Sequence, residues 1–360
     1  MKAKTNLVLL ATVSLATAAF ALGEHPAPGV GSPGMRYATD YYPGFDNEKD
    51  SISPERKEPK WFAFINGPNR TNATEQLEYC DGLLAAGDWS KARKQLDALV
   101  REWPTAPEAP EAQLKLAEVL LNNLLLYEDA FAEYRYLLDF YSLKCDYQAV
   151  ADKLYMVAHV MKREGKEVMF IRFANTVDVR RAFEACVLRA PGAKWVPEAM
   201  LEIARLREDE GKYVEAVKVY ENLRSLHPSS AEAKDALIRE AEDRMINMRE
   251  RAYNQARSRE TIDFLRMALR NCRAGDADRI QKFLTEAVLS SEDEAYRSAK
   301  FYDSSTRTLR SAVNAYERFI SEHPGSSKVE EVRARLAELK EKLAAQEAER
   351  AANREKEDGK

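Results

Sequence analysis

The chain has 360 residues, a formal net charge of −4, 45% hydrophobic residues and 32% charged residues. The small numbers of Gly (14) and Pro (14) argue against an architecture of many strands and tight turns. An acidic chain with interspersed charges lacks the basic footprint of a nucleic-acid-binding protein, and its length suits several hydrophobic cores or a repeat array.

Residues 1–21 predict an export signal. Lys2 and Lys4 precede an apolar run at 7–20, and residues 19–21 (AFA) form a small-x-small cleavage pattern. The run is short for a membrane span, which needs about 20 apolar residues, although an uncleaved anchor is the alternative. Cleavage would change the net charge from −4 to −4 − 2 = −6 and would place the protein outside the cytoplasm.

Residues 22–71 predict an extended arm or linker. Pro and Gly recur through this segment and interrupt both helical and strand periodicity. Its aromatic residues are expected to dock the arm onto the first helices, with binding of a partner as the alternative. These residues are Tyr41, Tyr42, Trp61, Phe62 and Phe64.

The cysteines are widely spaced and form no CxxC pair. They are Cys80, Cys145, Cys186 and Cys272. Such residues are expected to be small buried hydrophobic side chains. In an oxidising compartment they could also pair, and the spacing alone gives no connectivity.

A helical pattern begins at Asn72, which with Glu75 resembles a capping pair, and Gly87-Asp88 ends the first helix. The helix that follows introduces a repeated spacing. In this spacing an Ala at position i is followed by large apolar residues at i+4 and i+7. Trp-Pro or His-Pro then occupies positions i+11 and i+12. Copies of this spacing start at Ala92, Ala216 and Ala312, and looser copies start at Ala130 and Ala182.

This spacing predicts pairs of packed helices. Offsets of three and four place the residues on one helix face, the Ala allows close approach of the backbones, and the Pro ends the helix. Amphipathic first helices are expected at 110–125, 145–163 and 197–210, with Pro110 and Pro197 in their first turns. A two-helix unit that recurs about every 34 to 50 residues is typical of a helical solenoid.

Later helix starts carry expected capping boxes, Ser229 with Glu232 and Ser327 with Glu330. Residues 231–291 predict long charged helices. The solenoid is expected to end at residue 345, so that its range is 72–345, and residues 346–360 are expected to form a charged disordered tail.

An apolar segment, KEVMFIRF at 166–173, is expected between the two helices of the third pair. Its side chains are expected to tuck under the solenoid, as isolated apolar patches usually do. The alternative is a partner-contact surface formed by Met169, Phe170 and Phe173.

The repeat resembles the tetratricopeptide repeat. Gly87-Asp88-Trp89 and Gly211-Lys212-Tyr213 match that family's turn between helices, and Ala92, Ala216 and Pro228 match its second-helix and terminal positions. The resemblance implies an all-α fold, a right-handed helical solenoid of about five to six tetratricopeptide-like helix pairs. It also implies a groove lined by first helices, with a peptide-binding set of Leu77, Asp81, Leu114, Glu118, Leu201 and Arg205; a solvated inner face is the alternative for each residue.

The sequence predicts no enzyme. It contains no GxSxG, P-loop or HExxH motif, so we expect no catalytic residues, no metal site and no cofactor. His227 and His323 occupy equivalent helix-end positions about 100 residues apart, which makes a shared metal site improbable.

Residues 72–340 also resemble the BamD (YfiO) family of outer-membrane assembly proteins. The match at the C-terminal end depends on Phe301-Tyr302, Ala312, Tyr316, Pro324 and Glu330-Glu331. The resemblance implies a non-catalytic periplasmic scaffold, peripheral to the inner face of the outer membrane, whose partners are a barrel-inserting assembly protein and unfolded outer-membrane substrates. The alternative is a periplasmic tetratricopeptide adaptor for cell-division or cell-wall machinery.

One departure from this family concerns membrane attachment. Its members are typically lipoproteins anchored through a Cys directly after the signal, whereas Leu22 and Gly23 precede Glu24 here. No direct lipid anchor is therefore expected, so that any attachment would run through a partner.

Overall fold

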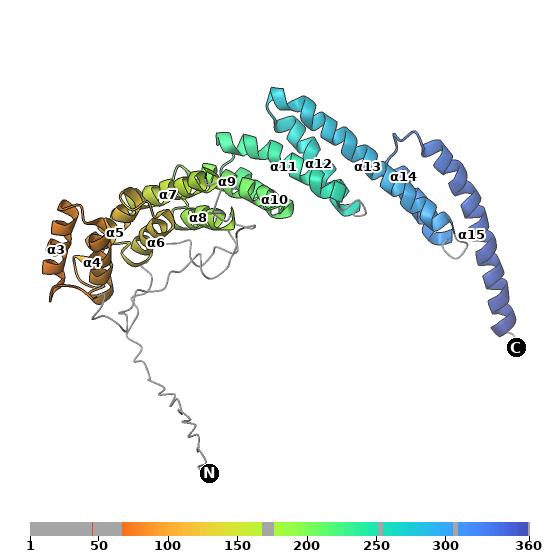
Figure 1. The fold of residues 1–360 in the computed structure, drawn as a ribbon. Coiled ribbons are helices and arrows are strands. Elements are labelled where there is room, and N and C mark those ends of the chain that lie inside the picture. The colour runs from red at the N-terminus through yellow and green to blue at the C-terminus, as the bar shows by residue number, and fades with distance from the viewer. Residues whose placement is uncertain (1–44, 46–66, 168–175, 251–254, 305–308, 359–360) are drawn as a thin grey trace, which may run out of the picture.

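The computed structural model describes residue 45 and residues 67–167, 176–250, 255–304 and 309–358. Within these residues the structure is all-helical, and consecutive helices pack as hairpins stacked side by side (Figure 1). The helices form six pairs and a last single helix: α3 (Ala73–Ala85) with α4 (Trp89–Glu102), α5 (Ala109–Asn122) with α6 (Tyr127–Phe140), α7 (Tyr147–Glu167) with α8 (Thr176–Arg189), α9 (Val196–Asp209) with α10 (Tyr213–Leu226), α11 (Ala231–Glu250) with α12 (Gln255–Asn271), α13 (Ala277–Asp303) with α14 (Leu309–Glu322), and α15 (Val329–Asp358). The predicted helical solenoid is confirmed.

The repeated alanines occupy equivalent places in the second helices. Ala92 in α4, Ala216 in α10 and Ala312 in α14 have an exposed fraction of 0%. The large residues four positions later, such as Tyr220 and Tyr316, are also buried. A larger side chain at any of these alanines would push two packed helices apart, which explains the small residue in each copy.

The turn after each second helix has the same geometry in all three strict copies. The residue before the proline, Trp103, His227 or His323, donates its backbone N–H to the carbonyl four residues earlier, each time at 2.9 Å. Its own carbonyl then accepts from the N–H three residues later, at 3.0–3.1 Å. The proline that follows needs no partner for an N–H, so the chain can leave the helix at this point.

The predicted helix starts are correct in part. The Asn72 side chain accepts from the N–H of Glu75 at 2.9 Å, as expected. The cap of α11 is Ser230, whose Oγ accepts from the N–H of Ala233 at 3.0 Å, so the expectation for Ser229 was wrong by one residue. At α15, Ser326 rather than Ser327 accepts a nearby N–H, because this helix begins only at residue 329.

The C-terminal end of the arm contacts the first hairpin. The N–H of Asn69 donates to the side-chain carbonyls of Gln76 (2.9 Å) and Gln95 (3.1 Å). Phe45 is 6% exposed and belongs to the core. The expected signal at 1–21, the remaining arm residues (22–44 and 46–66, including Tyr41, Tyr42, Trp61, Phe62 and Phe64) and the expected contact residues Met169, Phe170 and Phe173 lie outside the described residues.

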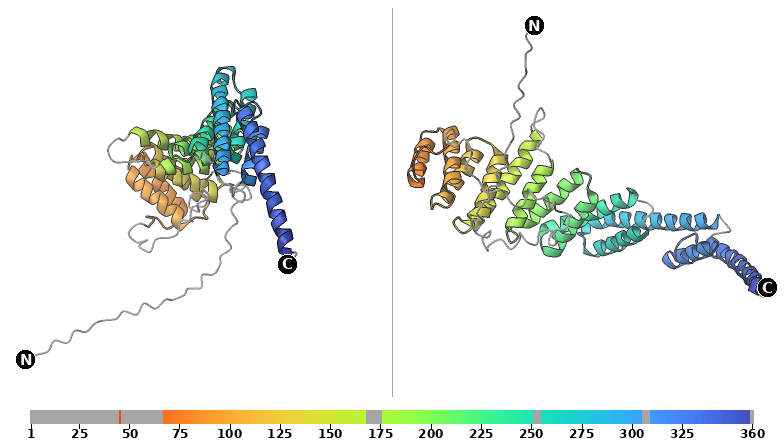
Figure 2. Two further views of the ribbon diagram at one scale, coloured as in Figure 1. Left: turned by 90° about the vertical axis from the view of Figure 1, so that its right-hand side faces the viewer. Right: turned by 90° about the horizontal axis from the view of Figure 1, so that it is seen from below.

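The core of the solenoid is divided into three clusters rather than being continuous. The first extends from α3 to α10 and includes Ala236 of α11, the second joins α11, α12 and the first half of α13, and the third joins the second half of α13 to α14 and α15. The 27-residue helix α13 therefore connects two cores. Figures 1 and 2 show the helices from α11 onwards extending away from the α3–α10 stack.

The last helix continues past the expected end of the solenoid. Residues 346–358, expected as part of a disordered tail, are the C-terminal part of α15, and this expectation is corrected. Alanines alternate with charged residues of both signs there, which is a strongly helix-forming composition. Among the described helices none is long and apolar enough to cross a membrane.

The turn between α5 and α6 carries backbone strain. Gly87 and Gly211 take positive φ angles (74° and 72°) in the turns of the first and fourth hairpins, but Leu125, with φ of 55°, does so here. An L-residue with a side chain loses about 1–2 kcal/mol in this conformation. Leu125 is also 57% exposed, so burial does not offset the strain.

Replacing Leu125 by Gly is expected to stabilise the protein by about 0.5–1 kcal/mol, the relief of strain less the added flexibility of the unfolded chain. Urea unfolding followed by circular dichroism measures the change. Leu143→Gly is the matched control, because Leu143 is 84% exposed in the next turn and has no positive φ. The control should lose stability, and equal losses in both variants would contradict the assignment of strain.

Candidate protein-binding face

Ion pairs join each first helix to the next along one face of the stack. Asp81 of α3 accepts from Lys115 of α5 at 2.6 Å. Glu118 of α5 pairs with Lys153 of α7. Two further pairs continue the series, Lys162 of α7 with Glu202 of α9, and Glu208 of α9 with Arg239 of α11. We call the surface that carries these pairs the first-helix face. The pairs make the face polar.

The leucines of the predicted groove contribute little open surface. Leu77 and Leu201 are 9% and 4% exposed, and Leu114 is half-buried against the core. Leu77 and Leu201 belong to the core cluster that extends from α3 to α10, and Leu114 packs against it. The structure therefore provides no open apolar pockets at these three positions.

The charged residues of the predicted groove do lie on this face. Asp81 and Glu118 belong to the pairs described above, and Arg205 donates to Glu202 at 2.9 Å. Each retains part of its side chain in solvent. Exposed ion pairs contribute little to stability, about 0–1 kcal/mol, so a ligand could exchange partners with these groups at low cost.

An aromatic cluster between α7 and α9 is the most distinctive feature of the first-helix face. The rings of Tyr155 and Trp195 are stacked, with centroids 4.4 Å apart and an interplanar angle of 6°. His159 meets Tyr155 edge to face at 4.6 Å and Phe183 at 5.0 Å. Tyr155 and Trp195 are half-buried, so part of the stack remains exposed between charged residues.

Polar contacts fix the orientation of this cluster. The indole N–H of Trp195 donates to Asp152 at 2.8 Å. Burial lowers the pKa of His159, while Glu198 and Glu202 act in the opposite direction. The imidazole is therefore neutral near pH 7, and it contributes to the cluster as an aromatic ring rather than as a cation.

A shallow hollow lies directly beside the cluster on α7. It has a volume of about 390 Å³, and its lining includes Met156, His159 and Lys162. Met156 is 48% exposed. An exposed Met next to a stacked aromatic pair forms an adaptable apolar contact surface.

Sequence reasoning did not anticipate the aromatic cluster. Tyr155 and His159 are four residues apart on one helix, and this spacing was a usable signal. Trp195 precedes Pro197 in the turn before α9 and gives no sign of its partner forty residues earlier. The cluster depends on tertiary packing of the third hairpin against the fourth.

No group of three His, Cys, Asp or Glu side chains among the described residues could bind a metal ion. The cysteines are unpaired, and burial raises the pKa of the Cys80 thiol to about 12. The Cys186 thiol pKa is raised for the same reason, so both thiols are unreactive packing groups near neutral pH.

Comparisons with known proteins identify the repeat. Residues 198–230, which form α9, α10 and the turn after them, match the family model described as Tetratricopeptide repeat. No curated protein sequence matches the chain. Among solved structures the chain is similar to a tetratricopeptide repeat protein from Parabacteroides merdae ATCC 43184, with 15% sequence identity, coverage of 74% of this chain and 98% of that chain, and a TM-score of 0.27. The repeat match and the stacked hairpins together indicate a protein–protein interaction scaffold of the tetratricopeptide type.

Proposed function

We propose that the chain is a non-catalytic periplasmic scaffold of the machinery that assembles outer-membrane β-barrel proteins. In this role its helical repeats bind unfolded substrate segments and the barrel-inserting partner. The expected export signal, the resemblance of residues 72–340 to the BamD (YfiO) family and the repeat match at 198–230 support the proposal. Attachment to the membrane would depend on the partner.

The aromatic cluster beside Met156 carries the proposal. An unfolded β-strand segment presents alternating apolar side chains together with unpaired backbone groups. The Tyr155–Trp195 stack and the exposed Met156 offer contacts for such apolar side chains. The surrounding charged residues, such as Asp152 and Lys162, can hydrogen-bond to the backbone of the segment.

Depletion of the protein tests the proposed location and role together. Outer-membrane proteins should decrease in abundance on depletion, and the barrel-inserting partner should co-isolate with the mature chain. Unchanged levels of outer-membrane proteins would reject the proposal. Cross-linking followed by mass spectrometry identifies the partners, and cell-division or wall-remodelling proteins among them would support the adaptor function instead.

Met156→Glu tests the binding face itself. A carboxylate in place of this exposed side chain is expected to lower recovery of the cross-linked partner at least tenfold, because it introduces a charge at an apolar contact. The free energy of unfolding should change by less than about 0.5 kcal/mol, as for most surface substitutions. Leu226→Glu is the control, since Leu226 is similarly exposed (43%) at the end of α10. Equal recovery of partner with both variants would exclude this face.

A further inference from the structure

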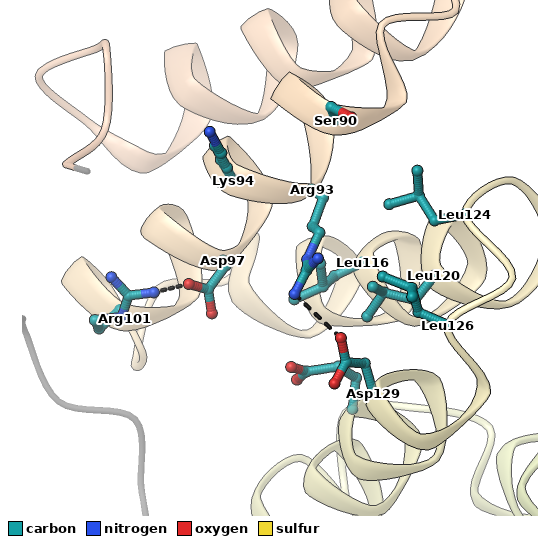
Figure 3. Close-up of a pocket in the computed structure, with 11 residues that line it drawn as sticks. Ser90, Arg93, Lys94, Asp97, Arg101, Leu116, Leu120, Leu124, Leu126 and Asp129 are labelled. Carbon is teal, nitrogen blue, oxygen red and sulfur yellow. Dashed lines mark hydrogen bonds and ion pairs between the residues drawn. The ribbon is translucent and has the colours of Figure 1, made fainter. Parts of the chain in front are cut away.

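A second candidate binding surface, with a polar rim and an apolar floor, lies on the side of the stack formed by second helices. It is a groove of about 610 Å³ between α4 and α6, with α5 beneath it (Figure 3). Leu116 and Leu120 of α5 form its buried floor, each only 1% exposed, and the half-buried Leu124 and Leu126 of the α5–α6 turn form its apolar edge. We call this feature the leucine groove. It is separate from the first-helix face because α4 and α6 are both second helices.

The acidic groups of the leucine groove are all engaged. Arg93 donates to Asp129 across the groove at 3.1 Å, and Arg101 pairs with Asp97 on α4 (Figure 3). Glu133 accepts from the side-chain amide of Gln113 at 2.6 Å. A cationic ligand would have to compete with these contacts.

Two donors on the α4 wall are available. Lys94 and Ser90 line the groove, both are exposed, and the structure gives neither side chain a partner among the described residues. They are four residues apart on α4 and therefore share a helix face. An ammonium and a hydroxyl in this arrangement can together receive a carboxylate, in a charge-assisted contact.

The strained turn is continuous with this groove. Leu125 lies between the lining residues Leu124 and Leu126, has a positive φ and is 57% exposed. The turns of the first and fourth hairpins use Gly at this point. A leucine that is both strained and exposed lowers the stability of the fold, so stability does not explain its presence. Backbone strain of this kind is concentrated at binding sites.

We propose that the leucine groove binds a segment of another protein that presents aliphatic side chains next to carboxylates. The aliphatic side chains would cover Leu124, Leu125 and Leu126 above the buried leucine floor, and a carboxylate would meet Lys94 and Ser90. A basic segment fits less well because every rim carboxylate already has a partner. The inference goes beyond the proposed function and requires neither export nor outer-membrane assembly.

Two synthetic amphipathic peptides test the proposal with the full-length mature chain. They share the same leucines and carry either Glu or Lys at the flanking positions. Fluorescence anisotropy measures their affinity, and methyl NMR of the leucine side chains locates them. The Glu peptide is expected to bind and to shift the methyl signals of Leu116, Leu120, Leu124 and Leu126. Equal binding of the two peptides, or shifts confined to other leucines, would overturn the proposal.

Charge reversal at Lys94 provides the decisive comparison. Lys94→Glu is expected to weaken binding of the Glu peptide at least tenfold and to favour the Lys peptide. Lys218→Glu is the matched control, because Lys218 follows Ala216 by two residues as Lys94 follows Ala92, and it is likewise exposed. The control should bind as the unaltered chain does. A loss of affinity in the control equal to that of Lys94→Glu would overturn the proposal.

Leu125→Gly separates binding from folding. The variant should gain stability, as argued above, while its affinity for the Glu peptide falls at least threefold. Unchanged affinity would remove Leu125 from the site and count against the proposal. Sedimentation of the unaltered chain should show no self-association through the groove. Self-association that Lys94→Glu abolishes would overturn the proposal, because a second copy of the chain would then be the occupant.

Discussion

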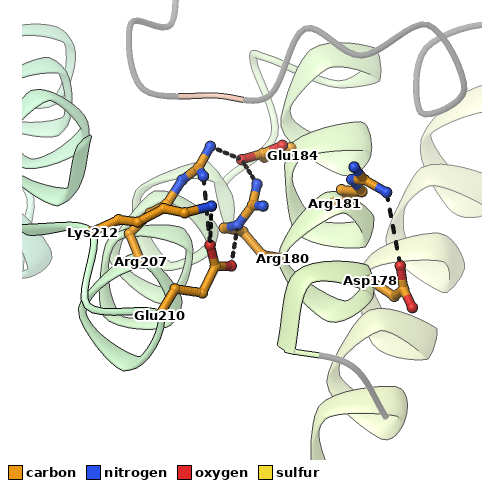
Figure 4. A network of polar contacts seen from close by, with 7 residues as sticks. All are labelled: Asp178, Arg180, Arg181, Glu184, Arg207, Glu210 and Lys212. Carbon is orange, nitrogen blue, oxygen red and sulfur yellow. Dashed lines mark hydrogen bonds and ion pairs between the residues drawn. The ribbon is translucent and has the colours of Figure 1, made fainter.

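Replacing Glu184 by Ala is expected to lower the free energy of unfolding by about 3–5 kcal/mol, because it removes one of the two carboxylates that pair with the buried Arg180 and Arg207. Glu184 of α8 accepts from Arg180 at 2.7 Å and lies 3.4 Å from Arg207 of α9. Glu210 completes the network, accepting from Arg180 at 2.6 Å (Figure 4). These four side chains are 8% exposed or less, so water cannot replace the missing partner.

The measurement is urea unfolding, with hydrogen exchange of α8, α9 and α10 as a local readout, since repeat arrays can lose single hairpins before the rest. Asp178→Ala is the control within the same helix. Asp178 is 56% exposed and lies 4.0 Å from Arg181, so this change should cost less than about 0.5 kcal/mol.

The double variant Arg180→Met with Glu184→Leu tests the physical reason. It removes one charge of each sign and replaces both side chains with apolar ones, so stability should exceed that of Glu184→Ala. A loss as large as in the single variant would mean that side-chain volume, rather than charge pairing, accounts for the effect.

The solenoid could be predicted from the sequence because each hairpin is specified by residues close together in the chain. Ala92 and Ala216 recur where two helices must approach closely, and Pro104 and Pro228 recur where the chain must leave a helix. Each of these roles depends on backbone geometry within one hairpin. The spacing of small, large and Pro residues is therefore sufficient to locate the second helices.

The buried charges could not be predicted in the same way. Periodicity treats Arg180 and Glu184 as solvent-exposed residues of α8, but the helix is covered on both sides and these residues are 0–1% exposed. They pair with Arg207 and Glu210, which belong to the following hairpin. Such long-range pairing leaves no signature within a single helix.

The candidate binding surfaces show the same limit. Repeat position places the charged residues Asp81 and Glu118 on the first-helix face, where both form ion pairs. The Tyr155–Trp195 stack was missed because it joins two hairpins. Leu125 was missed because its turn contains no glycine and is therefore not marked by composition. Side chains that form sites thus depend on packing between hairpins.

Replacing Asp243 by Asn is expected to make the stability of α11, the helix shared by the first two cores, less dependent on pH. Asp243 of α11 is 2% exposed, and its Oδ2 has no hydrogen-bond partner among the described residues. Burial, together with the nearby Glu208 and Glu242, raises its pKa to about 8, and Arg239 opposes this only in part. Its neighbour Glu240 is equally buried but accepts from Arg224 and Arg244 on either side.

The sign of the pH effect follows from proton binding. Between about pH 4 and pH 8 the folded state retains a proton on Asp243 that the unfolded state releases. Its contribution to stability is therefore fully present below about pH 4, decreases as the pH rises through this window, and is lost above pH 8. Charged groups that face Asp243 are Glu208 of α9 and Arg239, Glu240 and Glu242 of α11, and the Tyr220 hydroxyl of α10 also faces it.

Asn keeps the volume of Asp243 and cannot ionise, so the variant should gain at least about 3 kcal/mol at pH 8 relative to the unaltered chain, because an unpaired buried charged group costs more than a neutral polar one. Little difference is expected at pH 4, where Asp243 is protonated. Hydrogen exchange of α11 at both pH values measures the change, with Asp263→Asn as the control, because Asp263 is 73% exposed. If the stability of Asp243→Asn and that of the unaltered chain change in parallel with pH, the prediction is wrong, because Asp243 must then be ionised in the folded state.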